Sequence, residues 1–366
     1  MKQLRIVHTE SSLGWGGQEI RIFTEMLFMQ KRGHKVSLVA PRESQIFKRS
    51  EAAGIPCLPM SFKRSAWARD FFILKRFFKK ESVAVLNPHS SRDGWLAGLA
   101  GRSAGVPLIL RSRHIEVDYP NRFTSRIAFG RLPHHVLTTS DKIKNRLITE
   151  LSLKPADVTT IATGIDIEIY SGPRISTIRK ELKIASDVPI IGMVTVLRSW
   201  KGHPFFLEAA YSVLKSLPDT VFVIAGDGPQ RENIERKIID LGLTSNVLLL
   251  GHRSDVENIL KGLNALVLPS TAHEGIPQII LQAHASQTPV IGTNVGGIPE
   301  VVCHMETGLI IPHSDSTALA AAILEVLQNP SASASRAAKG NVFVAREHSQ
   351  AVMAKKLEAI YNRYCV

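Results

Sequence analysis

Short apolar segments alternate with segments of helical length along almost all of this chain. The apolar segments are hydrophobic at consecutive positions, which is typical of strands that are covered on both faces. Alternation of such strands with helices predicts an α/β fold with parallel sheets. The predicted strands are 4–8, 36–40, 83–87, 108–111 and 136–139 in the first half and 190–194, 221–225, 247–250, 265–268 and 290–293 in the second, and the clearest predicted helices are 17–32, 204–217, 230–241, 277–287 and 350–364.

A turn-forming cluster, Ser171-Gly172-Pro173, interrupts the alternation near the middle of the chain. The length of 366 residues suits two domains of roughly 170 residues each better than one core. We therefore expect an N-terminal domain over 1–171, a second domain over 172–349, and a C-terminal helix in 350–366 for which the N-terminal domain is one candidate docking surface. The two sheets would face each other across a cleft, with ligands beyond the carboxyl ends of the strands.

The composition is that of a globular protein with an excess of positive charge. Hydrophobic residues make up 44% and charged residues 21%, which excludes a disordered chain. The net charge of +13 favours an anionic partner, which can be nucleic acid, a membrane surface or a phosphorylated substrate. Cys57, Cys303 and Cys365 lack zinc-binding or redox spacing, which fits a reducing cytosol. Because no apolar run reaches about 18 residues and a strand begins at Leu4, we expect no membrane span, no signal peptide and a cytoplasmic location.

The loop after the first predicted strand is rich in glycine. It contains Gly14, Gly16 and Gly17 and leads into a helix. Glycines let the backbone approach a ligand closely, and the free N–H groups at a helix start suit a phosphate. The spacing is not that of the dinucleotide-binding fingerprint. The alternative is a plain tight turn.

Two loops of the second half have compositions that suit a diphosphate. Arg198 and Lys201 follow the first strand of that half, where two cations and a glycine would clamp a diphosphate. The alternative is a solvated basic turn. Gly226 and Gly228 follow the next strand, in a sequence typical of a tight turn that also allows a ligand close to the backbone.

The loop after the fourth strand of the second half carries the most chemistry. Glu274 stands at the predicted start of a helix, with Pro277 in its first turn. Gln282 lies about two turns and 12 Å further along, so the two side chains would hold opposite parts of one extended ligand. The alternative for Glu274 is a helix-capping acid. The next loop, 292–300, has paired glycines and ends at Glu300, which suits the first turn of another helix.

Taken together and in this order, the loops resemble those of the retaining family 4 glycosyltransferases (glycosyltransferase group 1) of the GT-B fold. The resemblance covers nearly the whole chain and is strongest over 190–312. It implies two facing Rossmann-like domains with parallel sheets and an interdomain cleft. Each motif is weak alone, but an unrelated chain would need all four at matching strand ends. The motifs are 191–202, 225–229, 274–277 and 296–300.

The resemblance assigns roles to individual residues. It implies that Arg198 and Lys201 neutralise the donor diphosphate, that Glu274 contacts the donor sugar, and that His114 of the first domain lies near the transferred sugar. It also places the paired glycines of the first loop beside the donor phosphates. The donor-binding residues that it implies are Gly16, Gly17, Gly226, Gly228, Arg253, Gly275, Ile276, Pro277 and Gln282.

Two positions depart from the family pattern. Gln282 stands where the family commonly has a glutamate that holds the ribose hydroxyls, and its amide can still donate and accept hydrogen bonds. Val196 stands where many relatives carry arginine. Arg198 is its candidate replacement, because two positions along an extended chain keep the same side. Either change is compatible with an unusual donor or weakened activity.

The resemblance also implies a mechanism without a cofactor. No Asp-x-Asp metal motif occupies a strand end, so cations and backbone N–H groups are expected to stabilise the leaving diphosphate. In the family, retention is ascribed to a front-face route in which that phosphate helps to deprotonate the acceptor. The implied activity is that of a metal-independent hexosyltransferase, with a UDP-sugar as donor on family frequency alone and a glycolipid, lipopolysaccharide or other polysaccharide precursor as acceptor. The donor sugar, the linkage and the oligomeric state do not follow from the sequence.

The segment 62–80 interleaves aromatic residues with cations, a pattern that suits the anionic inner face of the plasma membrane. The alternative is a sheet-covering helix with a solvated basic side. The same half holds further arginines, at Arg102, Arg111, Arg113, Arg122, Arg126 and Arg131.

Other functions remain open at this point. A nucleic-acid-binding protein would explain the charge, but it leaves the glycine loops and Glu274 without a role, and no helix-turn-helix, zinc or RNP pattern is present. A nicotinamide oxidoreductase would need the missing glycine fingerprint. A nucleotide-sugar epimerase of the GT-B fold would act on the donor without an acceptor. A binding homologue without activity is a further alternative, given Gln282.

Overall fold

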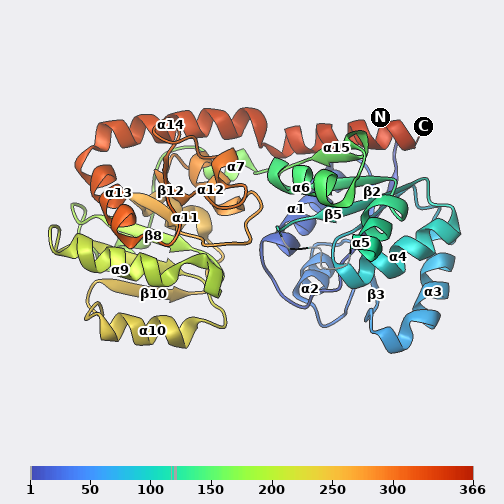
Figure 1. Ribbon diagram of the computed structural model, residues 1–366, viewed down its shortest axis with the longest axis horizontal. Coiled ribbons are helices and arrows are strands. Elements are labelled where there is room, and N and C mark those ends of the chain that lie inside the picture. The colour runs from blue at the N-terminus through green and yellow to red at the C-terminus, as the bar shows by residue number, and fades with distance from the viewer. Residues whose placement is uncertain (1, 117, 119–121, 366) are drawn as a thin grey trace. The chain divides into compact units, whose positions relative to one another are not determined.

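The computed structural model describes residues 2–116, 118 and 122–365, and the chain forms two compact units. The first unit comprises Met1–Gly164 with Gln350–Val366, and the second is Ile165–Ser349 (Figure 1). The first unit thus ends before the boundary expected near Gly172. Ile165 pairs with Ser349 in a parallel bridge, so the two points at which the chain passes between the units lie side by side.

The first unit is built on one parallel sheet. Its strands lie in the order β3-β2-β1-β4-β5-β6-β7, and each pair of neighbours is parallel. The order reverses between β1 and β4, which is the arrangement of a Rossmann fold. The strands are β1 (Arg5–Thr9), β2 (Lys35–Ala40), β3 (Cys57–Pro59), β4 (Val85–Pro88), β5 (Leu108–Arg113), β6 (His135–Thr138) and β7 (Val158–Thr160).

Helices cover both faces of this sheet because alternate residues of its strands point to opposite sides. Ile6 packs with α1, α2 and α15 in one buried cluster, whereas the next residue, Val7, packs with α3 and α4 in another. The helices are α1 (Gly17–Lys31), α2 (Gln45–Ala52), α3 (Trp67–Lys80), α4 (Ser91–Ala104), α5 (Arg122–Arg126), α6 (Asp141–Leu151) and α15 (Gln350–Tyr364).

The second unit repeats the topology with six strands. Their order is β10-β9-β8-β11-β12-β13, which reverses between β8 and β11. The strands are β8 (Ile190–Val194), β9 (Val221–Ala225), β10 (Val247–Gly251), β11 (Ala265–Leu268), β12 (Val290–Thr293) and β13 (Leu309–Ile311). The helices are α7 (Ile167–Tyr170), α8 (Ile178–Glu181), α9 (His203–Leu214), α10 (Arg231–Asp240), α11 (Val256–Gly262), α12 (Gln278–Ala285), α13 (Ser316–Gln328) and α14 (Pro330–Glu347).

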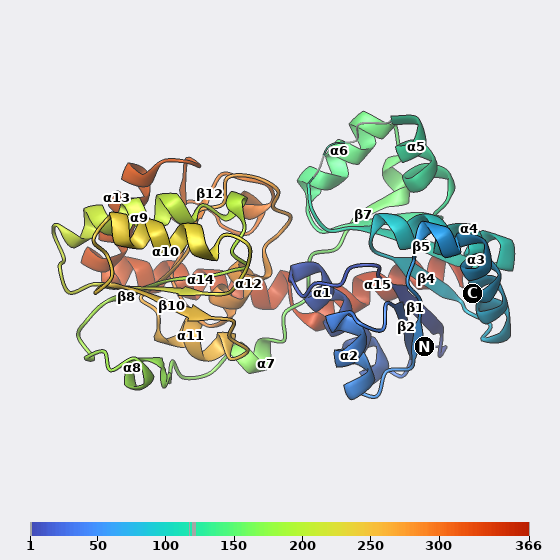
Figure 2. The same cartoon turned by 90° about the horizontal axis from the view of Figure 1, so that it is seen from below.

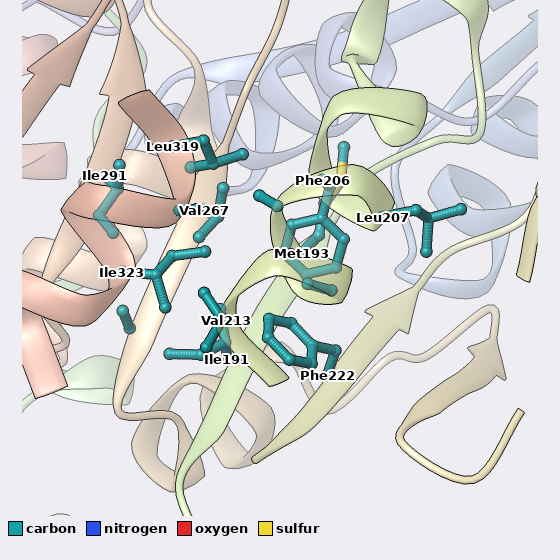
Figure 3. Packing of buried hydrophobic residues seen from close by; sticks show 14 of the residues in the cluster. Ile191, Met193, Phe206, Leu207, Val213, Phe222, Val267, Ile291, Leu319 and Ile323 are labelled. Atoms are coloured by element: carbon teal, nitrogen blue, oxygen red, sulfur yellow. The ribbon is translucent and has the colours of Figure 1, made fainter. Parts of the chain in front are cut away.

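The core of the second unit lies between its sheet and the helices α9, α10 and α13, which cover one face, while α11 lies on the other (Figure 2). Phe206 of α9 meets Phe222 of β9 edge to face, with ring centroids 5.7 Å apart. Ile191 and Val267 of the central strands and Ile323 of α13 fill the same cluster (Figure 3). This core fixes β8 and β11, the two strands whose carboxyl ends carry the candidate loops.

The structure confirms the predicted α/β fold with two parallel sheets, and each predicted strand is present with its ends shifted by at most two residues. Strands β3, β7 and β13 were not predicted, because three residues each are too short to show a pattern. The helix expected from 277 begins at Gln278, after Pro277 as its N-cap. Glu274 therefore lies in the preceding loop, and the helical spacing that we expected between it and Gln282 does not apply.

Helix α15 completes the core of the first unit. Its buried Leu357 and Tyr361 pack in the cluster of Ile6 and α1. Glu358 receives two hydrogen bonds from the Arg32 guanidinium, both of 2.6 Å, at the end of α1. Helix α15 is thus part of the hydrophobic core of the first unit.

The carboxyl end of β1 carries a buried carboxylate that shapes the glycine-rich loop. Glu10 is fully buried and accepts hydrogen bonds from the Ser12 amide, 2.8 Å, from the Gln18 side chain, 2.5 Å, and from Ser90. Burial, with the nearby Asp93 carboxylate, raises the pKa of Glu10 to about 7. These contacts hold the loop 11–16 between β1 and α1.

We predict that Leu357→Ala will destabilise the first unit by about 2–5 kcal/mol, because the truncation leaves a cavity in its core. Calorimetry should show the melting transition of the first unit at a lower temperature and that of the second unit unchanged. Lys356→Ala, at the exposed neighbouring position, is the control and should melt as the wild type does. Equal melting of the two variants would contradict the placement of α15 in the core.

The Glu10 carboxyl also predicts a pH dependence. Its pKa is about 7 in the fold against roughly 4.3 in an unfolded chain, so the fold favours the protonated form. The stability that this preference contributes is complete below the unfolded value and is lost as the pH rises through 7. Glu10→Gln removes this dependence. It should therefore gain stability relative to wild type between pH 5 and pH 8, by about 1–3 kcal/mol, in denaturant unfolding of the first unit. A constant difference across that range would contradict the burial of an ionisable Glu10.

Candidate functional site

A buried ion pair lies where the strand order of the second unit reverses. Lys201 follows β8 and Glu274 follows β11, and these strands are neighbours. The Lys201 Nζ donates to Glu274 Oε1 at 2.5 Å, and the Ser270 hydroxyl donates to the same oxygen at 2.6 Å. The side chains are only 17% and 7% exposed. The carboxylate is thus held by a lysine and a hydroxyl from the loops and does not cap a helix.

A glycine allows the two loops to meet. Gly202 has φ +79°, and a Cβ at this position would lie 1.9 Å from the Pro269 carbonyl oxygen. Only glycine fits both the left-handed backbone and the close approach. On the other side of Lys201, the Thr271 amide donates to the Trp200 carbonyl at 2.8 Å. The turn that presents Lys201 is therefore fixed against the loop that presents Glu274.

A third loop joins them from β12. Gly296 has φ +57°, and a Cβ there would lie 2.1 Å from the Glu274 carbonyl oxygen. The Gly297 amide donates to the Gly275 carbonyl at 3.2 Å, and the Thr293 hydroxyl donates to the Ser270 carbonyl at 2.7 Å. The loops after β8, β11 and β12 thus converge around Glu274.

Arg198 is exposed in the loop after β8, at the carboxyl edge of the second sheet. Its guanidinium lies 5.4 Å from the centroid of the Trp200 ring, and His273 contacts the same ring edge to face at 5.6 Å. The Arg198 backbone amide donates to the Val196 carbonyl at 2.8 Å, which makes the chain turn between these two positions. Arg198 and Lys201 therefore provide two cations on one turn, one exposed and one half-buried.

The glycine turn after β9 is tied to the same edge. The Leu197 amide donates to the Asp227 carbonyl at 3.0 Å, and the Gln230 amide donates to the Leu197 carbonyl at 3.0 Å. Gly226 and Gly228 lie in this turn beside the start of the Arg198 loop. The structure thus brings the turn with Gly226 and Gly228, after β9, next to the loop with Arg198 and Lys201, after β8.

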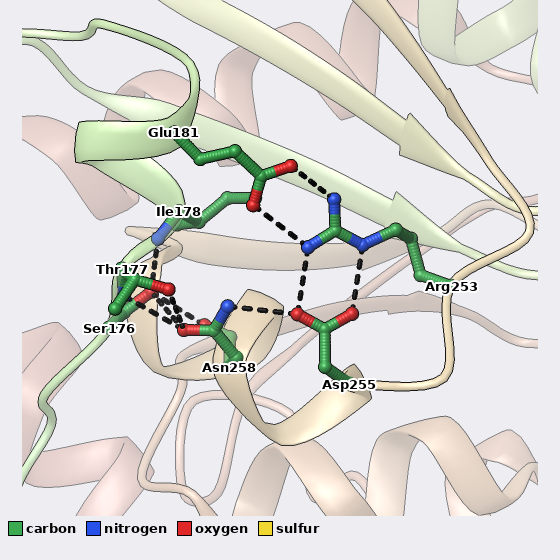
Figure 4. A network of polar contacts seen from close by, with 7 residues as sticks. All are labelled: Ser176, Thr177, Ile178, Glu181, Arg253, Asp255 and Asn258. Atoms are coloured by element: carbon green, nitrogen blue, oxygen red, sulfur yellow. Dashed lines mark hydrogen bonds and ion pairs between the residues drawn. The ribbon is translucent and has the colours of Figure 1, made fainter.

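The Arg253 side chain is occupied within the protein (Figure 4). Its guanidinium makes paired hydrogen bonds with Asp255, 2.8 and 2.7 Å, and with Glu181 of α8. The two carboxylates raise the pKa of Arg253, and Arg253 in turn lowers the pKa of Asp255. Contact with a nucleotide-sugar at this position would therefore be made by the backbone, unless the guanidinium exchanges its carboxylate partners.

The remaining predicted positions of this unit lie around the start of α12. Ile276 is buried at 8% exposure, and Pro277 is the N-cap of the helix. Gln282 lies one turn into α12 and faces the Tyr170 hydroxyl, where burial raises the tyrosine pKa. Gln282 is half-buried. Its amide thus sits beside a phenol in this structure.

The predicted residues of the first unit lie at the corresponding edge of its sheet. Gly16 is the N-cap of α1, and its amide donates to the Glu19 carboxylate at 2.9 Å. Gly17 is the first residue of the helix. His114 follows β5 and is buried at 8% exposure, with its Nε2 2.9 Å from His89 Nδ1.

Several residues at these edges were not predicted from the sequence. His8, His89, Glu10 and Asp93 gather at the carboxyl ends of β1 and β4, and Ser270 holds Glu274. The available signal was a polar residue at the end of an apolar run, as at His8 and Glu10. Among the described residues, no group of three or more histidine, cysteine and acidic side chains has an arrangement that could hold a metal ion.

Sequence models of two families match consecutive parts of the chain. "Glycosyltransferase Family 4" matches residues 15–169, and "Glycosyl transferases group 1" matches residues 174–341. The second match contains the Lys201–Glu274 pair and its three loops. The first contains the glycine-rich loop and His114.

Characterised relatives and solved structures agree with these matches. The UDP-Gal:α-D-GlcNAc-diphosphoundecaprenol α-1,3-galactosyltransferase of Escherichia coli is 30% identical over 267 residues, which is 69% of this chain and 68% of the relative. A glycosyltransferase of Rickettsia africae superposes with a TM-score of 0.90 at 20% identity, over 100% of this chain and 99% of that one. HepE of Anabaena, solved in complex with UDP and glucose, superposes with a TM-score of 0.87 at 18% identity, over 99% and 100% of the two chains.

The Rossmann order of both sheets, the converging loops, the matches to both families and the galactosyltransferase relative lead to one conclusion. This chain belongs to the family 4 glycosyltransferases of the GT-B fold.

Proposed function

We propose that this glycosyltransferase takes a hexose from a UDP-sugar and transfers it, with retention of the anomeric configuration and without a metal ion, to a glycolipid or polysaccharide precursor. The observation that carries the proposal is the buried Lys201–Glu274 pair where the second sheet reverses its strand order. Ligands of such sheets bind at this point. The pair supplies a cation for a diphosphate and a carboxylate for sugar hydroxyls side by side.

In the proposed reaction, the bond between the anomeric carbon and the diphosphate oxygen breaks, and the acceptor oxygen bonds to the same face of that carbon. The acceptor proton passes to the departing phosphate oxygen, so no separate base is needed. Negative charge grows on the diphosphate as it leaves, and preorganised cations aimed at it lower the barrier. Arg198 and Lys201 have this role, and Glu274 holds the donor sugar. His114 is the residue of the first unit that we place near the transferred sugar.

The choice of UDP rests on relatives. The E. coli relative is named for a UDP-galactose donor, and HepE was solved with UDP-glucose as well as with UDP. The proposed surroundings of the nucleotide are the turn with Gly226 and Gly228 and the segment from Gly275 to Gln282, which leads into α12. Gly16 and Gly17, at the start of α1, are the proposed neighbours of the donor phosphates in the first unit, because the start of a helix favours an anion. A phosphate there would take the place of the Glu19 carboxylate, to which the Gly16 amide donates at 2.9 Å.

The choice of acceptor rests on relatives and on α3. The E. coli relative acts on a diphosphoundecaprenol-linked sugar, and a relative of Staphylococcus aureus, 26% identical over 299 residues, is named for capsular polysaccharide biosynthesis. No helix in the described part of the chain has the length and apolar character to cross a membrane. We propose that the protein instead touches an anionic membrane surface through α3, as a peripheral protein on the inner face of the plasma membrane.

Helix α3 has the amphipathic form that this contact needs. Asp70, Leu74 and Phe78 are buried against the rest of the first unit, as the alternative of a sheet-covering helix requires. The opposite face exposes Phe72 at 66% and Ile73 at 42%. Exposed cations lie in the helix and in the residues before it, at Lys63, Arg64, Arg69, Arg76, Lys79 and Lys80.

The reaction distinguishes the proposal from an epimerase of the same fold. A transferase should release UDP in proportion to the glycosylated acceptor that it forms. When no acceptor is present, it should leave the donor sugar unchanged. An epimerase would convert the donor without acceptor. Product analysis by mass spectrometry, with a membrane extract as the source of acceptor, separates the two, and conversion of the donor alone would contradict transfer.

We predict that Lys201→Ala will lower kcat by about 10²–10³, because it removes a cation that acts on the leaving diphosphate. The measurement is UDP release during sugar transfer. The control is Lys237→Ala, which removes another lysine that donates to a carboxylate, Glu208, at 2.5 Å in the same unit but outside the three loops. The control should keep full activity. Less than a threefold difference between the two variants would remove Lys201 from the proposed mechanism.

We also predict that the protein will cosediment with vesicles of anionic phosphatidylglycerol at low salt and not with neutral phosphatidylcholine. Each basic residue near the surface contributes about 1 kcal/mol, so Arg76→Gln combined with Phe72→Ser should weaken binding more than tenfold. The matched control is Ile239→Ser in α10, where the apolar side chain is also 66% exposed. Failure of the wild type to bind anionic vesicles at low salt would overturn the membrane contact.

A further inference from the structure

Three buried histidines form a continuous hydrogen-bonded chain in the first unit. His8 lies in β1, His89 follows β4 and His114 follows β5, three strands that are neighbours in the sheet. His8 Nδ1 lies 2.9 Å from His89 Nε2, and His89 Nδ1 lies 2.9 Å from His114 Nε2. The rings of His8 and His89 are nearly parallel, at 6°. Their exposed fractions are 0%, 4% and 8%, so the His114 end is the nearest to the surface.

All three rings are neutral near pH 7. Burial lowers the pKa of His8 to about 3 and those of His89 and His114 well below the usual value. The positive charges of Arg21, Arg111 and Arg113 act in the same direction on the rings. A neutral imidazole carries one N–H and one bare nitrogen. Two hydrogen bonds between three such rings allow only two arrangements, with all the protons pointing toward His8 or all pointing toward His114.

The surroundings of His8, at the inner end of the three histidines, decide which of the two arrangements forms. Arg21 is buried, stays charged and donates to the Ile161 carbonyl at 2.7 Å. Its Nε lies 3.6 Å from Glu25 Oε2. The pKa of the Glu25 carboxyl is raised by burial, and the Arg21 charge and the Asn87 amide offset part of that rise. A buried guanidinium needs a counter-charge, and Glu25 is the acid placed to supply it.

An ionised Glu25 orders the protons along the whole chain. Its Oε1 lies 3.9 Å from His8 Nε2, so the negative charge favours an N–H at that nitrogen. His8 Nδ1 is then bare and accepts from His89 Nε2. His89 Nδ1 is bare in turn and accepts from His114 Nε2. The remaining nitrogen, His114 Nδ1, carries no proton.

We propose that His8, His89 and Glu25 are positioning residues that fix the tautomer of His114, leaving His114 Nδ1 bare to accept a hydrogen bond from a sugar hydroxyl. The last step rests on the proposed sugar-transfer function, whereas the tautomer does not. The three hydrogen-bonded histidines link the buried Arg21–Glu25 pair to the His114 ring at the carboxyl edge of the sheet. They thereby give His114 one fixed hydrogen-bonding role, which an isolated neutral histidine would lack.

Nitrogen NMR of the full chain, labelled with ¹⁵N in its histidines, tests the tautomer directly. We expect the His114 signals, assigned by their loss in His114→Gln, to show a proton on Nε2 and none on Nδ1. His8→Asn and Glu25→Gln should each give a mixture of the two tautomers, because each removes the link between Glu25 and the chain. Two variants are used because either buried change risks misfolding. The control, His135→Gln, replaces a histidine that is 2% exposed and bonded to Thr159 outside the chain.

A proton on His114 Nδ1 in the wild type would overturn the inference, as would an unchanged tautomer in whichever of the two variants folds. In a transfer assay, His8→Asn should lower kcat about tenfold, the size expected for the loss of one orienting hydrogen bond, with the KM for the donor unchanged and His135→Gln active. Absence of any sugar transfer by the wild type would contradict the proposed function, while the NMR result would still decide the tautomer.

Discussion

The ion pair between the half-buried Lys201 and the buried Glu274 is the interaction on which the site of the second unit depends. Removal of two charges from water costs several kcal/mol per ion, and their attraction repays this only with good geometry. The pair therefore contributes little to the free energy of unfolding. The close lysine contact and the Ser270 hydrogen bond instead hold both groups at defined positions. In the proposed reaction, the diphosphate replaces Glu274 as the partner of Lys201, and the carboxylate becomes available to sugar hydroxyls.

The same topology places two different kinds of chemistry in the two units. Each sheet reverses its strand order beside its first strand, and the polar residues gather there in both. The second unit has a lysine and a glutamate in loops that glycines bring together. The first unit has the buried Glu10 and the three-histidine chain. The division fits a donor held mainly by the second unit and a first unit that orients the transferred sugar.

Much of the fold followed from the sequence, because continuous apolar strands and amphipathic helices are local patterns. The predicted strand ends also located Lys201 and Glu274 in loops that follow strands, whereas the contact between these loops depends on the strand order, in which β8 and β11 are neighbours. The sequence could not show that Glu274 lies before its helix, since Pro277 fits an N-cap as well as a first turn. It could not show the histidine chain either, because His8, His89 and His114 meet only through the order β1-β4-β5. The pairing of Arg253 with Glu181, across 72 residues, depends on tertiary contacts in the same way.

The most direct test of the account is the melting temperature of the protein with UDP, GDP, ADP, NAD or a short single-stranded DNA. A ligand at 100 times its Kd stabilises the fold by about 2.7 kcal/mol, which is readily measured. The account predicts a clear rise with UDP and none with NAD or DNA. A rise with GDP alone would keep the donor site and change the base. A rise with only DNA or NAD would contradict the assignment of the Lys201–Glu274 edge as a nucleotide-sugar site.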